Sequence, residues 1–158
     1  MKKGFALNSE NKFEIDTTPL GQQETYVRVA GGLNNFDPQW NEELDQTQYL
    51  DGDGYGSSDV TGAQLVISFE GHRNYGDAAQ DYIASLQPLL GESRKTNFRW
   101  TQPNGDQFAG NVTVANIVGA GGDANAKTAF SFEVHFNGKP VFTPAEEVTQ
   151  TTETGTTP

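Results

Sequence analysis

Apolar and polar residues alternate along several short segments of the chain, which is the pattern of β-strands that bury one face and expose the other. The clearest segment is residues 129–136, in which phenylalanine and valine alternate with serine, glutamate and histidine. Similar patterns predict further strands at residues 25–30, 63–70, 96–101 and 107–118. Strands with one buried face are typical of antiparallel sandwiches and barrels.

Short turns that contain glycine connect the later strands. Asn104-Gly105 separates residues 96–101 from 107–118, and an Asn-Gly pair between two strands is a strong signal for a β-hairpin. The glycine-rich residues 119–122 lead into another strand rather than a helix, which favours a second hairpin turn over a phosphate-binding loop. We therefore predict a mostly-β fold of two packed antiparallel sheets, similar to a sandwich or barrel, with one flanking α-helix, a long loop and extended termini.

One segment has the periodicity of an amphipathic helix instead. Asp77 is suited to the N-cap position, and Pro88 and Gly91 would end the helix. The apolar side chains that recur at helical spacing between these limits are Ala79, Tyr82, Ile83 and Leu86. We predict a helix over about residues 77–87 whose apolar stripe packs on the sheet.

The chain length of 158 residues suits a single domain. We expect an N-terminal arm over residues 1–20, a β-sandwich domain over residues 21–144 and a C-terminal tail over residues 145–158. The tail contains no aromatic residue and cannot form a packed core, so it is predicted to be disordered.

Residues 31–61 form a long connector without clear periodicity. Structureless loops longer than about 12–15 residues are uncommon in compact domains unless they have a function. The connector also carries several large aromatic or aliphatic side chains, namely Phe36, Trp40, Tyr49, Leu50 and Tyr55. We interpret it as a functional loop rather than an idle linker.

The charge of the chain limits the partners that we expect. The formal net charge is −11, which argues against a protein that binds nucleic acid by neutralising its phosphates. Acidic residues are concentrated in residues 31–60, which contain no lysine or arginine. The N-terminal residues have no apolar run of the signal-peptide kind, and no stretch approaches the roughly 20 apolar residues of a membrane span, so no membrane partner is expected.

A search for catalytic and metal-binding patterns favours a protein that is not an enzyme and has no cofactor. The chain has no cysteine, and no catalytic motif accompanies His72 or His135. Asp51, Asp53 and Asp59 form a weak calcium candidate, because three carboxylates lie on a glycine-rich segment. The twelfth residue of that segment is a glycine rather than the glutamate of the helix–loop–helix calcium motif, which favours a flexible acidic loop tip.

Three stretches of the chain resemble the major tail tube proteins of long-tailed bacteriophages: residues 48–54, 67–83 and 132–140. The likeness extends over most of residues 1–144. It implies a virion protein that forms hexameric rings stacked into a tube, with DNA passing through the channel without specific binding. It also implies tape-measure, tail-initiator and tail-terminator proteins as partners. Contractile tails, non-contractile tails and tail-derived bacteriocins all stay open.

The resemblance also implies roles for particular residues. The loop at about residues 41–60 would contact the neighbouring ring, and the expected contact residues are Tyr49, Leu50, Asp51, Asp53 and Tyr55. The two arms would correspond to residues 1–20 and about 139–150. A lumen with carboxylates would repel phosphate, and the candidates for such charges are Glu70, Asp106 and Glu133.

A second class of function stays open at this stage. The chain could be a monomeric β-sandwich binding module that holds carbohydrate or calcium through Trp40, Trp100 and the loop at residues 51–59. A tube subunit should polymerise as its concentration rises, whereas a binding module should stay monomeric and be stabilised by its ligand.

Overall fold

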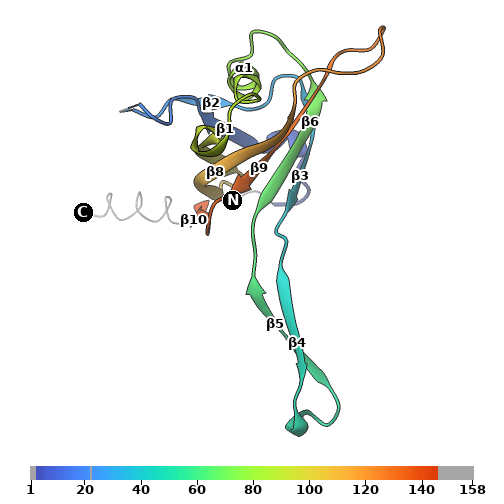
Figure 1. Ribbon diagram of the computed structural model, residues 1–158. Coiled ribbons are helices and arrows are strands. Elements are labelled where there is room, and N and C mark those ends of the chain that lie inside the picture. The colour runs from blue at the N-terminus through green and yellow to red at the C-terminus, as the bar shows by residue number, and fades with distance from the viewer. Residues whose placement is uncertain (1–2, 22, 146–158) are drawn as a thin grey trace, which may run out of the picture.

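The computed structural model describes residues 3–21 and 23–145, and these residues form a mostly-β fold (Figure 1). The larger part of the predicted C-terminal tail, residues 146–158, lies outside the described residues. The strands are β1 (Lys12–Asp16), β2 (Tyr26–Arg28), β3 (Leu33–Gln39), β4 (Glu43–Gln48), β5 (Gly56–Gly62), β6 (Val66–His72), β7 (Lys95–Thr101), β8 (Gln107–Val118), β9 (Ala129–Phe136) and β10 (Val141–Thr143). The helix is α1 (Ala78–Ser85), and short 3₁₀ turns are η1 (Asn8–Glu10), η2 (Leu50–Gly52) and η3 (Gly91–Arg94).

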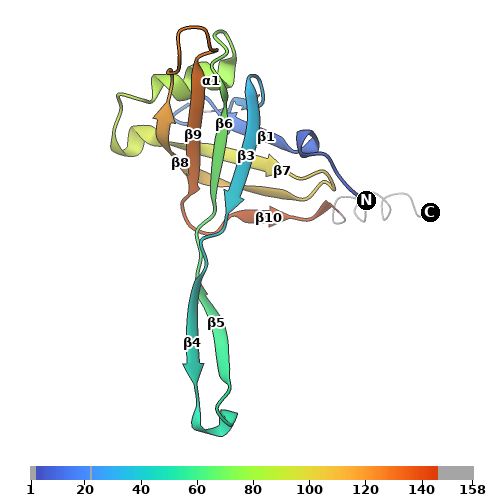
Figure 2. The ribbon, with the colours of Figure 1, turned by 90° about the vertical axis from the view of Figure 1, so that its right-hand side faces the viewer.

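Eight strands form one antiparallel sheet in the order β2-β1-β7-β8-β9-β6-β3, with β10 paired to the first residues of β8. The sheet curls so that its two ends approach each other (Figure 2): the ring centroids of Phe13 on β1 and Phe36 on β3 are 4.9 Å apart. Within the described residues the end strands β2 and β3 do not pair, so the barrel stays open along this seam. The predicted antiparallel β fold is confirmed, and its two packed layers belong to one continuous sheet.

The alternation predicted from the sequence decides which face of the sheet is buried. Val112, Val114, Phe132 and Val134 are at most 1% exposed, and their strand neighbours point to the opposite, polar face. The concave face also buries phenylalanine rings from β1, β6 and β7. Burial of one such side chain stabilises the fold by about 1.5–3 kcal/mol.

The N-terminal and connecting segments differ from the sequence-based expectation. Lys12–Asp16, expected in the N-terminal arm, form strand β1 between β2 and β7, because Phe13 and Ile15 alternate with charged residues and are buried. In the long connector, Leu33–Gln39 form β3, and the expected loop at about residues 41–60 is the antiparallel hairpin β4–β5. The hairpin carries no apolar alternation because neither of its faces is buried, and periodicity could therefore not reveal it.

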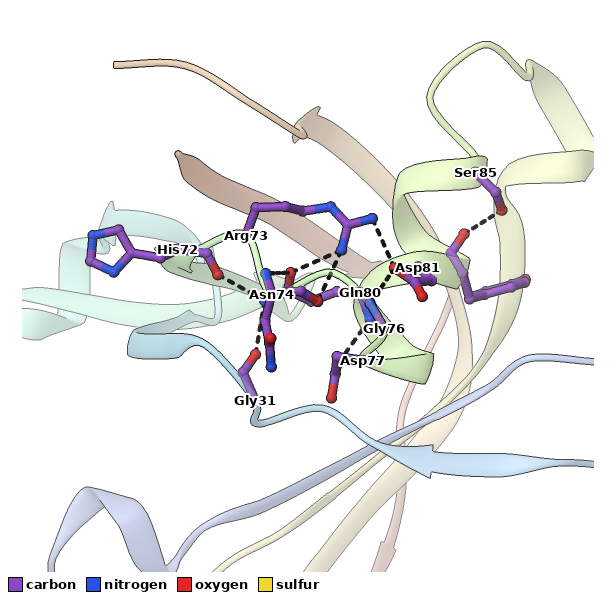
Figure 3. Close-up of polar contacts among 10 residues, drawn as sticks. Gly31, His72, Arg73, Asn74, Gly76, Asp77, Gln80, Asp81 and Ser85 are labelled. Atoms are coloured by element: carbon purple, nitrogen blue, oxygen red, sulfur yellow. Dashed lines mark hydrogen bonds and ion pairs between the residues drawn. The ribbon is translucent and has the colours of Figure 1, made fainter. Parts of the chain in front are cut away.

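Helix α1 begins after its predicted N-cap Asp77 and is attached to the sheet by the buried side chain of Gln80, which is 1% exposed (Figure 3). Gln80 Nε2 donates hydrogen bonds to the carbonyl oxygens of Gly31 at 2.8 Å and His72 at 3.0 Å. Its Oε1 accepts hydrogen bonds from the backbone N–H of Asn74 at 2.7 Å and from Arg73 Nη1 at 3.3 Å. The amide thus satisfies backbone groups from two segments that are far apart in the sequence.

We expect Gln80→Ala to lower the free energy of unfolding by about 1–3 kcal/mol, because the substitution removes a buried amide that bonds partly buried backbone groups of Gly31, His72 and Asn74. Urea unfolding followed by circular dichroism measures the change. The matched control is Gln46→Ala, at an exposed position of β4, which should stay within about 0.5 kcal/mol of the unchanged protein. Equal stability of the two variants would show that the Gln80 network does not hold the helix.

Candidate functional site

The β4–β5 hairpin projects away from the curled sheet, and its tip gathers the residues expected to contact a neighbouring ring (Figures 1 and 2). Tyr49, Leu50 and Tyr55 are 61%, 106% and 80% exposed. Asp51 lies in the turn η2, and Asp53 follows it in the left-handed conformation with φ of 54°. The tip therefore presents three large side chains and two carboxylates to solvent.

The strands of the hairpin also bury no apolar side chains between them. Leu44 on β4 lies opposite Val60 on β5, and the two side chains are 56% and 58% exposed. Asp45 lies directly opposite Asp59, and like charges in such a cross-strand pair are destabilising.

A two-stranded ribbon by itself is marginally stable in water. Exposed apolar side chains on such a ribbon are typical of a surface that becomes buried against another molecule. The sequence analysis did not identify the Leu44–Val60 pair, because only the register of β4 and β5 places these residues opposite each other.

The outward, polar face of the sheet brings two of the three predicted lumen charges together. Glu70 pairs with Ser131 and Glu133 pairs with Ser68, so both glutamates lie on the same face of the neighbouring strands β6 and β9. Asp37 on β3 also pairs with Ser68 and adds a third carboxylate, which the sequence did not single out. The acidic part of the polar face is defined here as Asp37, Glu70 and Glu133.

Glu133 is held in its ionised form. Asn116 Nδ2 donates to Glu133 Oε1 at 2.8 Å, and His135 Nε2 lies 2.9 Å from the same oxygen. These hydrogen bonds from Asn116 and His135 lower the pKa of Glu133 below its ordinary value. The side chain therefore carries a negative charge at neutral pH.

Asp106 has a different position and role. It lies in the hairpin turn before β8, whereas Glu133 pairs with Ala115 in the second half of that strand. Its Oδ1 accepts a hydrogen bond from the backbone N–H of Ala145 at 3.0 Å, and its Oδ2 accepts one from Asn104 at 2.9 Å. The structure does not bring Asp106 together with the other two candidates, and its carboxylate anchors the segment that follows β10.

The opposite end of the polar face carries cations as well as acids. Lys12, Arg28 and Arg99 lie on β1, β2 and β7, on the face that also carries Glu14. Arg99 Nη2 lies 3.3 Å from Glu14 Oε2, and its guanidinium stacks 3.6 Å from the ring centroid of Tyr26. The edge strand β2 thus carries Arg28, whereas the edge strand β3 carries Asp37.

A hollow of about 400 Å³ lies at the open seam between β1–β2 and β3. Its walls include the rings of Phe13, Phe36 and Phe69. Asn34 from β3 and Ser9 from η1 also line it.

The three aspartates proposed for a calcium site are spread along the hairpin rather than gathered at one point. Asp59 faces Asp45 in the middle of the hairpin, whereas Asp51 and Asp53 lie at its tip. Across residues 3–21 and 23–145, no group of three or more histidine, aspartate or glutamate side chains is placed to hold a metal ion. Trp100 is 5% exposed and donates its ring N–H to Asn11, so its expected role in an exposed aromatic platform is wrong.

In the part of the chain that the structure describes, no helix has both the length and the hydrophobicity needed to cross a membrane.

No protein-family model matches the chain, and no curated protein matches it in sequence. Solved structures do match it. A chain from the tail of an empty GTA particle, determined with C6 symmetry, has a TM-score of 0.69 and 17% identity, over 88% of this chain and 99% of that one. A chain from the virion of a native gene transfer agent (GTA) particle has a TM-score of 0.65 and 15% identity, over 88% and 99%. A chain from the tube-terminating cap of the anti-feeding prophage has a TM-score of 0.53 and 13% identity, over 92% and 95%.

These similarities identify the class of fold. The chain has a fold that occurs in the tails and tube caps of phage-like particles. The resemblance to phage tail tube proteins is therefore confirmed at the level of the fold.

Proposed function

We propose that this protein is a structural subunit of a phage-like tail, which polymerises as stacked hexameric rings into a tube for the passage of DNA. The observation that carries the proposal is the exposed β4–β5 hairpin on a body with the tail fold. The protein would act in the tail of a virion after synthesis in the bacterial host. Tape-measure, initiator and terminator proteins would be its partners, and it would have no enzymatic activity.

The hairpin supports contact between copies of the chain. Its apolar tip and its Leu44–Val60 pair are exposed in the monomer, and its opposed aspartates weaken it. These features are unfavourable in a free subunit. They become favourable if the hairpin packs on another subunit, since burial of the tip then removes apolar surface from water.

The edges of the sheet support a closed ring. Strand β3 with Asp37 is one edge, and strand β2 with Arg28 is the other. Edge strands offer unpaired backbone groups for pairing with another chain. A contact between two different edges is heterologous and generates a ring when the rotation closes. Opposite charges at the two edges favour this head-to-tail arrangement over the pairing of identical edges.

The acidic part of the polar face supports a channel for DNA. If Asp37, Glu70 and Glu133 line the lumen, their carboxylates repel phosphate and prevent DNA from adhering to the wall.

Negative-stain electron microscopy of the purified full-length protein over a range of concentrations tests the proposal. We expect hollow tubes or six-fold rings whose number rises with concentration. Single small particles at all concentrations, together with an increase in Tm on adding calcium or oligosaccharides, would contradict it and favour a binding module.

A further inference from the structure

We propose that the hollow at the open seam of the sheet is the receptor for the hairpin tip of a second copy of this chain. This inference rests on the proposed function and names the surface against which the hairpin packs. The tip is defined as residues 49–55, and the seam hollow is the space of about 400 Å³ between β1–β2 and β3.

The tip cannot occupy the hollow of its own chain. The hairpin extends away from the body in both views (Figures 1 and 2). The hollow is lined by residues of η1, β1, β3 and β6, which belong to the body. Any contact between these two surfaces therefore joins different copies. Such a heterologous contact can be repeated from subunit to subunit, as a stacked assembly requires.

Both surfaces combine apolar with polar groups. The hollow is lined by Phe13, Phe36 and Phe69 together with polar side chains such as Asn34 and Asn35, and its volume lies within the roughly 300–1,000 Å³ of typical ligand pockets. The tip offers Leu50, which is 106% exposed, with a tyrosine on either side. Tyrosines are enriched among the residues that carry interface energy, and Tyr49 and Tyr55 flank Leu50 in the tip.

The two surfaces also match in charge. Residues 42–60 contain several acids and no lysine or arginine, and Asp51 and Asp53 lie at the tip. Among the described residues that line the seam hollow, the one charged side chain is Arg28. Contact would therefore place the guanidinium close to the tip carboxylates.

A second hollow, between α1 and the end of β8, fits the tip less well. Its charged lining residue Arg73 already pairs with Asp81 at 2.9 Å and stacks on Tyr75. This guanidinium already has two partners and is therefore less available to a carboxylate of another copy.

Thiol crosslinking tests the proposal, because the chain contains no cysteine of its own. Leu50→Cys is mixed with Asn34→Cys or Ser9→Cys, which place a thiol on either side of the seam hollow. The mixture is polymerised and treated with a short bis-maleimide. The control pair is Leu50→Cys with Ser85→Cys, at an exposed position on α1.

We expect crosslinked dimers to form at least tenfold more with the seam variants than with the Ser85→Cys control. Tubes that form without a seam crosslink would overturn the receptor assignment and leave the tube proposal intact. Failure of the unsubstituted protein to polymerise would overturn both.

A charge exchange gives a second readout on the same contact. Arg28→Glu should raise the concentration needed for polymerisation by about tenfold, and combination with Asp51→Arg and Asp53→Arg should reverse part of that increase. If the combined variant polymerises no better than Arg28→Glu, the charge pairing at the seam is wrong.

Discussion

Replacement of residues 42–62 by two glycines will abolish polymerisation and leave the body of the protein folded. No residue of β4 or β5 is buried, so the deletion removes no part of the core. The backbone N–H of Gln64 donates to the carbonyl oxygen of Trp40 at 2.9 Å, which shows that the two ends of the deletion lie side by side. We expect no tubes at concentrations at which the unchanged chain polymerises, and a Tm within a few degrees of the unchanged value.

A matched pair of point substitutions separates the tip from the rest of the hairpin. Leu50 and Leu90 are 106% and 85% exposed, and Leu90 lies outside the hairpin, directly before η3. Leu50→Ser should reduce polymerisation severely, whereas Leu90→Ser should not. Sedimentation velocity and electron microscopy measure the polymer. Equal polymerisation of the two variants would contradict a role for the tip.

Phe69→Ala will have the largest effect on stability among the substitutions considered. Phe69 on β6 is 2% exposed and stacks on Phe132 of β9 with ring centroids 4.8 Å apart. Its ring also meets Phe13 of β1 edge-on at 4.9 Å, so it connects the two ends of the curled sheet. We expect a loss of about 3–5 kcal/mol, because truncation removes buried apolar surface and leaves a cavity. This loss is a large share of the roughly 5–15 kcal/mol that stabilises a typical domain.

The control for this prediction is Phe142→Ala on β10. Phe142 is 49% exposed and stacks on Phe108 at 5.0 Å, so the same truncation should cost far less there. Urea unfolding at constant temperature gives both values. A Phe69→Ala variant no less stable than Phe142→Ala would show that the Phe69 ring contacts do not stabilise the curled sheet.

The predicted functions of the hairpin and of the polar face depend on different properties. The hairpin would act through apolar contact, so its substitutions should change assembly. The acidic part of the polar face would act through charge, so changes at Glu70 or Glu133 should affect the passage of DNA more than the formation of tubes. Because assembly and DNA passage are measured separately, an experiment can contradict one proposal and leave the other intact.

The sequence alone determined the elements whose signals are local. Strands β8 and β9 match the predicted ranges 107–118 and 129–136, because alternation over many residues reports one buried face. Helix α1 follows from its Asp77 cap and its apolar stripe. The residues of the hairpin tip lie together because they are neighbours in the chain, and no long-range pairing is needed to assemble them.

Only the tertiary structure decided which separate segments meet. The place of β1 in the sheet, the seam hollow and the acidic part of the polar face each depend on strand order, which alternation does not encode. The opposition of Asp45 and Asp59 depends on register within a ribbon that buries neither face. Gln80 is buried because backbone groups near Gly31 and His72 converge on it. These features arise from contacts between residues far apart in the chain, and a local pattern carries no information about such contacts.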